Sequence, residues 1–157
     1  MEMNTQKYAN LDKKRHTIRA AVFVFLLKEG KTFLLRRQNT GWADGMLTVP
    51  SGHVEEGETI REAAAKEARE EAGVIIAQKD LEFMHVHYIH DVYVNFYFKT
   101  TVWEGEPYCA EPELCSEVVW TSLDALPADT IYQVRNVLQE TLKKNWFSEI
   151  ENDPKAS

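Results

Sequence analysis

The sequence contains few cysteines, fewer basic than acidic side chains and no long apolar run. Only Cys109 and Cys115 occur among 157 residues, too few for a disulfide framework, so we expect free thiols in a reducing cytoplasm. The longest strongly apolar run, Ala21 to Leu27, is too short to span a bilayer and indicates a buried strand. The first 16 residues are polar and charged and contain no apolar signal-peptide core. These absences predict a cytoplasmic protein without a membrane partner.

Acidic side chains outnumber basic ones by 25 to 18, which gives a formal net charge of −7. Duplex nucleic acid and anionic membranes are bound by a broad basic face, so we expect neither as a partner. A small anionic substrate remains compatible with this charge, because bridging metal ions reverse the local sign of the field. The content of hydrophobic residues (44%) and of charged residues (27%) is ordinary for a soluble globular protein.

The chain has the length of one domain and contains no repeat, low-complexity tract or internal linker. We expect a single domain over residues 17–147. A flexible N-terminal segment (1–16) and a flexible C-terminal tail (148–157) are expected to flank it. Nothing in the sequence distinguishes a monomer from a homodimer.

Apolar periodicity predicts more strands than helices. Alternation and turn residues predict strands at 17–27, 31–38, 47–50, 81–90, 92–103 and 117–121. Helical spacing predicts two helices, at 59–72 and 128–144. Two helices can cover the two faces of one sheet, so we expect an α/β (α+β) fold, an α/β/α sandwich with a mixed β-sheet.

The first of these helices has the clearest boundaries. Thr59 and Glu62 form a capping box at its start, and Gly73 supplies a left-handed stop at its end. Small or aliphatic side chains form one stripe that can pack closely on a sheet: Ile60, Ala64 and Ala68.

Three glutamates share another face of this helix. Glu67, Glu70 and Glu71 stand at i, i+3 and i+4, which places their Cβ atoms roughly 5–6 Å apart. Like charges at this spacing repel one another, and Mg²⁺ relieves the repulsion because it prefers carboxylate oxygens. The alternative is a solvated helix face with ion pairs such as Lys66–Glu70.

The segment from Gly52 to Val74 resembles the Nudix box. That pattern is a glycine, five residues, a glutamate, seven residues, Arg-Glu, an aliphatic, any residue, Glu-Glu, any residue, a glycine and an aliphatic. The matching residues are Gly52, Glu58, Glu67, Ala68, Glu70, Glu71, Gly73 and Val74. Lys66 stands where the family has arginine. Eight matches at fixed spacing over 23 residues favour the metal-site interpretation over a solvated helix face.

The resemblance implies a Nudix-type α/β/α sandwich and a divalent metal cofactor, which is Mg²⁺ or, as an alternative, Mn²⁺. It also implies that Glu67 and Glu71 are metal ligands, that Glu70 is a third ligand or the general base, and that the carbonyl of Gly52 is a further ligand. Glu58 completes the catalytic set by pairing with the residue at position 66 and orienting the loop. Because lysine lacks the planar fork of arginine, we expect looser bracing here.

Downstream of the box, residues 103–111 (WEGEPYCAE) resemble MutT-like nucleoside triphosphate pyrophosphohydrolases. This second resemblance implies that Glu111 is a metal-binding carboxylate outside the box, with Glu113 and Glu117 as alternatives. Asp129, in LPADT, lies where that group has an asparagine or aspartate that binds the base. The alternative for Asp129 is an N-cap of the last helix.

Two further residues are expected to bind substrate: His53, which lies inside the box and would contact phosphate, and Arg37. Three other histidines, His85, His87 and His90, alternate along a predicted strand. They lack an acidic or cysteine partner in register, so we favour structural roles over a metal site for them.

The resemblance implies a pyrophosphohydrolase of a small nucleotide, a (d)NTP or oxidised dNTP that yields a nucleoside monophosphate and pyrophosphate. Hydrolysis of ADP-ribose or another sugar nucleotide is less favoured, because that subgroup has a proline beyond the box and this chain has none between Pro50 and Pro107. Dinucleoside polyphosphate hydrolases have a tyrosine in this region, so Tyr88 leaves that activity as an alternative. A nucleotide-binding module without activity is disfavoured, because all box glutamates are present.

Overall fold

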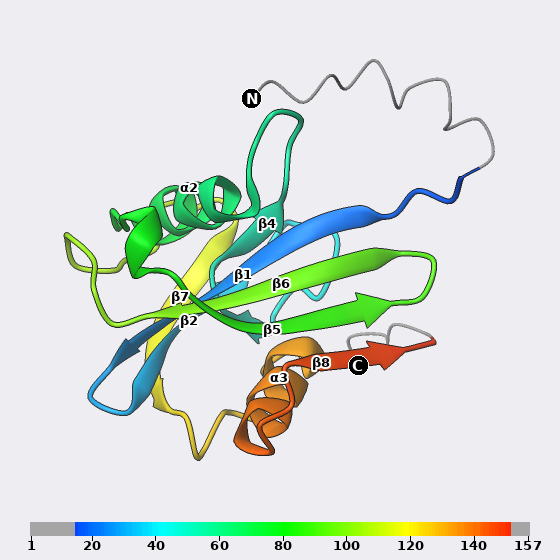
Figure 1. Ribbon diagram of the computed structural model, residues 1–157. Helices are drawn as coiled ribbons and strands as arrows, with labels where there is room; N and C mark the ends of the chain where they lie inside the picture. The colour runs from blue at the N-terminus through cyan, green and yellow to red at the C-terminus, as the bar shows by residue number, and fades with distance from the viewer. Residues whose placement is uncertain (1–14, 152–157) are drawn as a thin grey trace.

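The computed structural model describes residues 15–151 (Figure 1). The predicted terminal segments fall largely on residues 1–14 and 152–157, which lie outside the described residues. None of the described helices is long and apolar enough to cross a membrane. Both cysteines are free thiols, as predicted.

The elements follow in the order β1 (Arg19–Lys28), β2 (Lys31–Arg37), β3 (Leu47–Thr48), β4 (Ser51–His53), α2 (Ile60–Ala72), the 3₁₀ helix η2 (Gln78–Asp80), β5 (Glu82–Ile89), β6 (Tyr93–Thr100), β7 (Cys115–Ser122), α3 (Tyr132–Leu142) and β8 (Phe147–Ile150).

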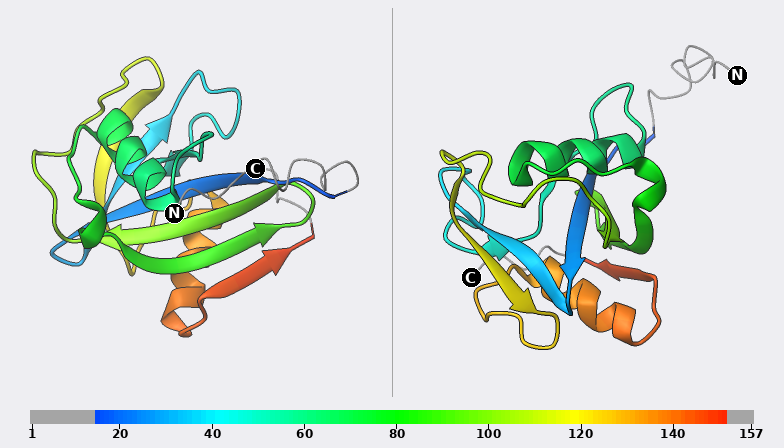
Figure 2. Two further views of the ribbon diagram at one scale, coloured as in Figure 1. Left: turned by 45° about the horizontal axis from the view of Figure 1, so that its top comes forward. Right: turned by 90° about the vertical axis from the view of Figure 1, so that its left-hand side faces the viewer.

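The eight strands form one mixed sheet in the order β3-β2-β1-β6-β5-β8, to which β4 is added beside β1 and β7 beside β2. β1 runs parallel to β6, and β5 runs parallel to β8, while the other pairs are antiparallel. Along its length β1 changes its second partner, from β4 at Ala21–Phe23 to β2 at Leu27 and Lys28. The helices α2 and α3 lie on opposite sides of the strands (Figure 2). The structure thus confirms the predicted α/β/α sandwich with a mixed sheet.

The central strand β1 is buried on both faces because its apolar residues do not alternate with polar ones. Val22, Val24 and Leu26 pack into the core that also contains the alanines of α2. Phe23 and Phe25 point to the other side and pack with residues of α3. This explains the apolar run of the sequence without a membrane segment.

The helix α2 begins and ends as the sequence predicts. Thr59 is its N-cap in a complete capping box with Glu62, and Gly73 closes it with φ of 68°. The fully buried residues of α2 are all alanines: Ala63, Ala64, Ala68 and Ala72. Methyl groups keep the helix axis close to the sheet, which brings its glutamates within reach of β4.

Most predicted elements are found with boundaries shifted by one to three residues, and two elements differ more. The expected helix 128–144 begins only at Tyr132, because backbone bonds hold the preceding residues against β3: Leu47 N–H donates to Asp129 O and Ile131 N–H donates to Leu47 O, both at 2.9 Å. The expected strand 47–50 is divided between β3, which pairs with β2, and β4, which pairs with β1.

Strand β8 has no counterpart in the prediction, and it extends the sheet into the segment that was assigned to a tail. A chain of hydrogen bonds attaches it to β5. His85 Nδ1 lies 3.0 Å from Asn145 O and therefore donates, so its Nε2 accepts from the hydroxyl of Ser148 at 2.7 Å. The same hydroxyl oxygen accepts from His87 Nδ1 at 2.8 Å. These contacts agree with structural roles for His85 and His87.

This histidine pair should make the protein less stable in acid. Burial lowers the pKa of His87 to about 4 and also lowers the pKa of His85, against the opposing effects of Asn145 and Glu140. In the unfolded chain both side chains have a pKa of about 6.5, so they take up protons below that pH when the protein unfolds. Their contribution to the free energy of unfolding is complete above pH 6.5 and falls by up to about 1.4 kcal/mol per pH unit and histidine as the pH drops towards the folded pKa.

Chemical denaturation between pH 7 and pH 5 tests this expectation. His87→Leu should lose part of the wild-type decrease in the free energy of unfolding, whereas His90→Leu, at an exposed position, should keep it. Equal pH dependence in His87→Leu and the wild type would contradict the assignment.

Candidate active site

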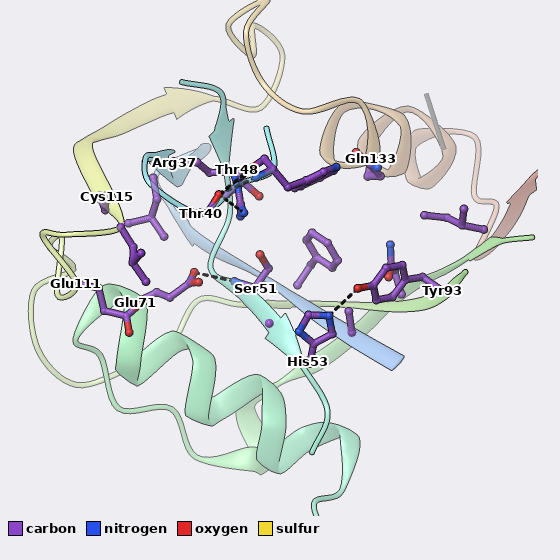
Figure 3. A pocket seen from close by; sticks show the side chains of 18 residues that line it. Arg37, Thr40, Thr48, Ser51, His53, Glu71, Tyr93, Glu111, Cys115 and Gln133 are labelled. Carbon is purple, nitrogen blue, oxygen red and sulfur yellow. Dashed lines mark hydrogen bonds between the residues drawn. The ribbon is translucent and has the colours of Figure 1, made fainter. Parts of the chain in front are cut away.

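A cavity of about 480 Å³ opens beside β4, and five of the predicted site residues line it: Arg37, Gly52, His53, Glu71 and Glu111. Figure 3 shows Glu71 and Glu111 together on one side of the cavity, while Tyr93 of β6 and Gln133 of α3 lie on the other. Residues from distant parts of the sequence are thus combined in one site. One end of the cavity is acidic, and the other end is polar and uncharged.

Glu71 reaches from the last turn of α2 to the start of β4. The backbone N–H of Ser51 donates to its Oε2 at 2.9 Å (Figure 3). Burial raises the pKa of Glu71 to about 8, and the negative charges of Glu67 and Glu111 add to this effect. The Ser51 N–H and the guanidinium of Arg37 oppose it. The carboxylate is therefore oriented, but its negative charge is not fully compensated by the protein.

Glu67 lies directly over Gly52. A Cβ atom on Gly52 would stand 2.1 Å from Cδ of Glu67, so only glycine leaves room for this carboxylate. Burial raises the pKa of Glu67 to about 7; Lys66 opposes this shift, and the charges of Glu70 and Glu111 add to it. The spacing between Gly52 and Glu67 in the box motif thus has a steric reason in this fold.

Glu111 is held beside α2 by the loop that precedes β7. Ala110 N–H donates to Glu71 O at 3.1 Å, and the N–H groups of Leu114 and Cys115 donate to Glu111 O at 2.9 and 3.0 Å. Burial raises the pKa of Glu111, with further contributions from Glu113 and Glu70. The loop therefore brings a fourth carboxylate to the acidic end, where Glu70 lies exposed on the same helix.

The donor set of this acidic end fits a hard divalent cation. Within residues 15–151, no three acidic, histidine or cysteine side chains form a complete ligand group. Mg²⁺ does not need one, since it is usually held by one or two carboxylates together with water and substrate phosphates. The carboxylates of Glu67 and Glu71, both with a raised pKa, offer such partial ligation, and a cation between them would remove their repulsion.

Lys66 takes the place of the arginine of the box motif and does pair with Glu58. Its Nζ lies 2.9 Å from Oε1 of Glu58, and it also lies 3.6 Å from Glu55 and 3.7 Å from Glu67. The pair raises the pKa of Lys66 and lowers that of Glu58. Arg61, on the same helix, takes no part in this pairing, because its guanidinium donates to the carbonyls of Gln78 and Leu81.

Arg37 and His53 border the cavity with their positions fixed by neighbours. Arg37 donates from Nε to Trp42 O at 2.8 Å and from a terminal nitrogen to Thr40 Oγ1 at 2.9 Å. Its guanidinium lies 5.0 Å from the centre of the Trp42 ring. His53 Nε2 lies 2.7 Å from the hydroxyl of Tyr93.

Asp129 does not line the cavity. Its Oδ2 accepts from Arg36 at 2.7 Å, and the same guanidinium binds Glu117 at 2.6 Å. The alternative role as an N-cap is wrong, because Ile131 is the cap residue of α3 and no side chain caps that end. Contact of Asp129 with a base stays a prediction.

The sequence did not indicate that Tyr93, Asn95 and Gln133 line the same cavity. The alternation along β6 predicts that Tyr93 and Asn95 share a face, but it carries no sign of a cavity. Gln133 comes from a helix whose position no local pattern defines.

The fold and the site define a class: an α/β/α sandwich in which a glutamate-rich helix borders a cavity. Residues 17–141 match the model of the NUDIX domain family, which covers most of the chain. The chain belongs to this family.

Two relatives and one solved structure show how far the likeness extends. An ADP-ribose pyrophosphatase of Methanocaldococcus jannaschii is 38% identical over 77 residues, which are 48% of this chain and 45% of the relative. An 8-oxo-dGTP diphosphatase of Haemophilus influenzae is 29% identical over 75% of this chain and 84% of the relative. The crystal structure of a MutT NUDIX hydrolase from Burkholderia pseudomallei has the same fold, with a TM-score of 0.71 and 23% identity over 78% of this chain and 97% of that one. The chain spans less than half the length of the first curated relatives that it matches.

Gly52→Ala tests the contact between β4 and Glu67. The new methyl group should displace the flexible end of Glu67 and leave the backbone intact, since no positive φ is required at this position. We expect a small change in melting temperature and a loss of nucleotide hydrolysis of at least about 10-fold, the scale of a misplaced catalytic group. Ser51→Ala, which keeps the backbone N–H, is the control. Full activity of Gly52→Ala would show that the position of Glu67 is not critical.

Lys66 can be tested with a pair of variants. Lys66→Met should lower activity, because Glu58 loses the partner that braces it. Lys66→Arg should retain or raise activity, because a guanidinium can brace Glu58 through two hydrogen bonds. A large loss of activity in Lys66→Arg would mean that the lysine has a function of its own.

Proposed function

We propose that the chain is a Mg²⁺-dependent pyrophosphohydrolase that cleaves a nucleoside triphosphate, including oxidised dNTPs, into a nucleoside monophosphate and pyrophosphate. The observation that carries the proposal is the pair of carboxylates held against β4: Glu71, which lines one end of the cavity, and Glu67, which lies over Gly52 of the same strand. Members of the family typically depend on a divalent metal. This chain covers 84% and 85% of two 8-oxo-dGTP diphosphatases, which supports a triphosphate substrate.

The residues have separable roles in this reaction. Glu67, Glu71 and the carbonyl of Gly52 would hold the cation, which when bound supplies an activated water and neutralises phosphate oxygens. Glu70, exposed to solvent on the same helix face, is placed to accept a proton from the attacking water, and Glu111 adds a further carboxylate. Arg37, whose fork is fixed by Trp42 and Thr40, would bind phosphate oxygens at the same end.

Hydrolysis of ADP-ribose is the second candidate. The match with the archaeal ADP-ribose pyrophosphatase favours it, although that match covers only 48% of this chain. The missing proline beyond the box counts against it. Release of phosphate or pyrophosphate from a panel of dNTPs, oxidised dNTPs, ADP-ribose and dinucleoside polyphosphates separates these activities.

The assignment of roles predicts opposite effects on stability and turnover. Glu70→Gln and Glu71→Gln should leave the fold intact, and the metal-free protein should gain a few tenths of a kcal/mol at each site from reduced repulsion. Turnover with Mg²⁺ should fall by roughly 10²-fold or more, the effect of losing a ligand or a general base. Excess EDTA should abolish turnover of the wild type.

Glu62→Gln is the matched control, because its side chain accepts only from Thr59 N–H in the capping box and a glutamine keeps that acceptor. Its turnover should be close to that of the wild type. Near-normal turnover of both Glu70→Gln and Glu71→Gln would overturn the proposed hydrolase.

A further inference from the structure

Asn95 is a buried amide that faces the cavity without a partner. It is 4% exposed and lines the cavity from β6. Among the described residues no group bonds its side chain, and its amide atoms are not sealed in the interior but open to the cavity. An Asn side chain offers two donors and one acceptor, and these are available to a ligand in the cavity. This arrangement indicates a ligand that supplies the missing hydrogen bonds.

A second unsatisfied group stands next to Asn95. In the sheet register His87 of β5 is directly opposite Asn95, so both side chains project from the same face. Because His87 Nδ1 donates to Ser148, its Nε2 is left as an acceptor, and this atom is buried without a partner among the described residues. Two adjacent polar groups thus lack partners on the α3 side of the sheet.

The position of Asn95 relative to the glutamates suits a nucleotide. At Ala21, β1 pairs with His53 of β4 on one side and with Asn95 of β6 on the other. Asn95 is therefore two strand spacings, about 10 Å, from the strand on which Glu67 and Glu71 rest. Tyr93, two residues along β6 from Asn95, lines the cavity together with apolar side chains such as Phe23 and Ile89. Glu71 and Glu111 lie on the side away from Tyr93 (Figure 3).

We infer that Asn95 binds the nucleobase of the substrate, at the uncharged end of the cavity, and so contributes to base selectivity. An amide presents a donor beside an acceptor, and it forms paired hydrogen bonds with the edge of a base, as asparagine does with adenine. Asp129 is less suited to this role, because its carboxylate is paired with Arg36 and does not line the cavity. The inference rests on the proposed action on nucleotides. It assigns the binding of the base to the end of the cavity that the metal-binding residues do not occupy.

The experiment compares Asn95→Leu with the wild type, since leucine keeps the approximate volume and removes all hydrogen bonds. Values of kcat and KM are measured for the four dNTPs and for the abasic deoxyribose triphosphate, which has the same phosphates and no base. Asn95→Leu should raise KM for the preferred dNTP by about 10- to 100-fold, flatten the preference among bases and leave turnover of the abasic compound unchanged. Asn136→Leu, an amide of α3 outside the cavity lining, is the control and should behave as the wild type.

Binding without metal gives a readout that does not depend on catalysis. The melting temperature is followed while the nucleoside monophosphate or pyrophosphate is added. Asn95→Leu should weaken stabilisation by the monophosphate and not that by pyrophosphate.

Two outcomes would overturn the inference: unchanged base preference in Asn95→Leu, or an equal loss for dNTPs and the abasic compound. Both leave the proposed hydrolase standing if the wild type turns over nucleotides. A wild type that cleaves no nucleotide but binds the monophosphate through Asn95 would instead refute the hydrolase and support the base contact.

Discussion

The close approach of α2 to β4 is the contact on which the acidic end of the cavity depends. Four buried alanines allow the helix to lie near the sheet, and Gly52 leaves space for the carboxylate of Glu67. The hydrogen bond from Ser51 N–H to Glu71 then fixes the end of the helix against the strand. A larger side chain in place of one of the alanines would separate the elements, and one in place of Gly52 would displace the carboxylate of Glu67.

The same approach creates the electrostatic character of the site. Bringing Glu67 and Glu71 out of solvent raises the pKa of both, and Lys66 is the basic side chain that lies against Glu67. This lysine is shared with Glu58 and Glu55, so it compensates only part of the negative charge. A cation that binds here therefore finds carboxylates that are positioned before it arrives, which reduces the reorganisation that binding requires.

Along the cavity, charged and uncharged groups are separated. Arg37, Glu71 and Glu111 gather at the end formed by α2 and the loop before β7, whereas Tyr93 of β6 and Gln133 of α3 lie on the other side. The sheet places these groups because β1 carries β4 on one side and β6 on the other. Such a division suits a ligand with a polyanionic part and a neutral polar ring.

The sequence alone determined the features that depend on local spacing. The limits of α2 follow from Thr59, Glu62 and Gly73, and the face shared by Glu67, Glu70 and Glu71 follows from helical geometry. The buried strand β1 was likewise predictable, since its apolar run is too short to span a bilayer and too apolar to lie exposed to solvent.

The tertiary structure decided what depends on contacts between distant segments. Helix α3 starts late because β3 binds the residues before it, and β8 forms only because β5 offers it a sheet edge and two histidines. Asp129 is turned to Arg36, and Asn95 is brought to the cavity, by strand pairing that no local pattern encodes. Periodicity defines which residues share a face, but only the packing of the elements defines what that face meets.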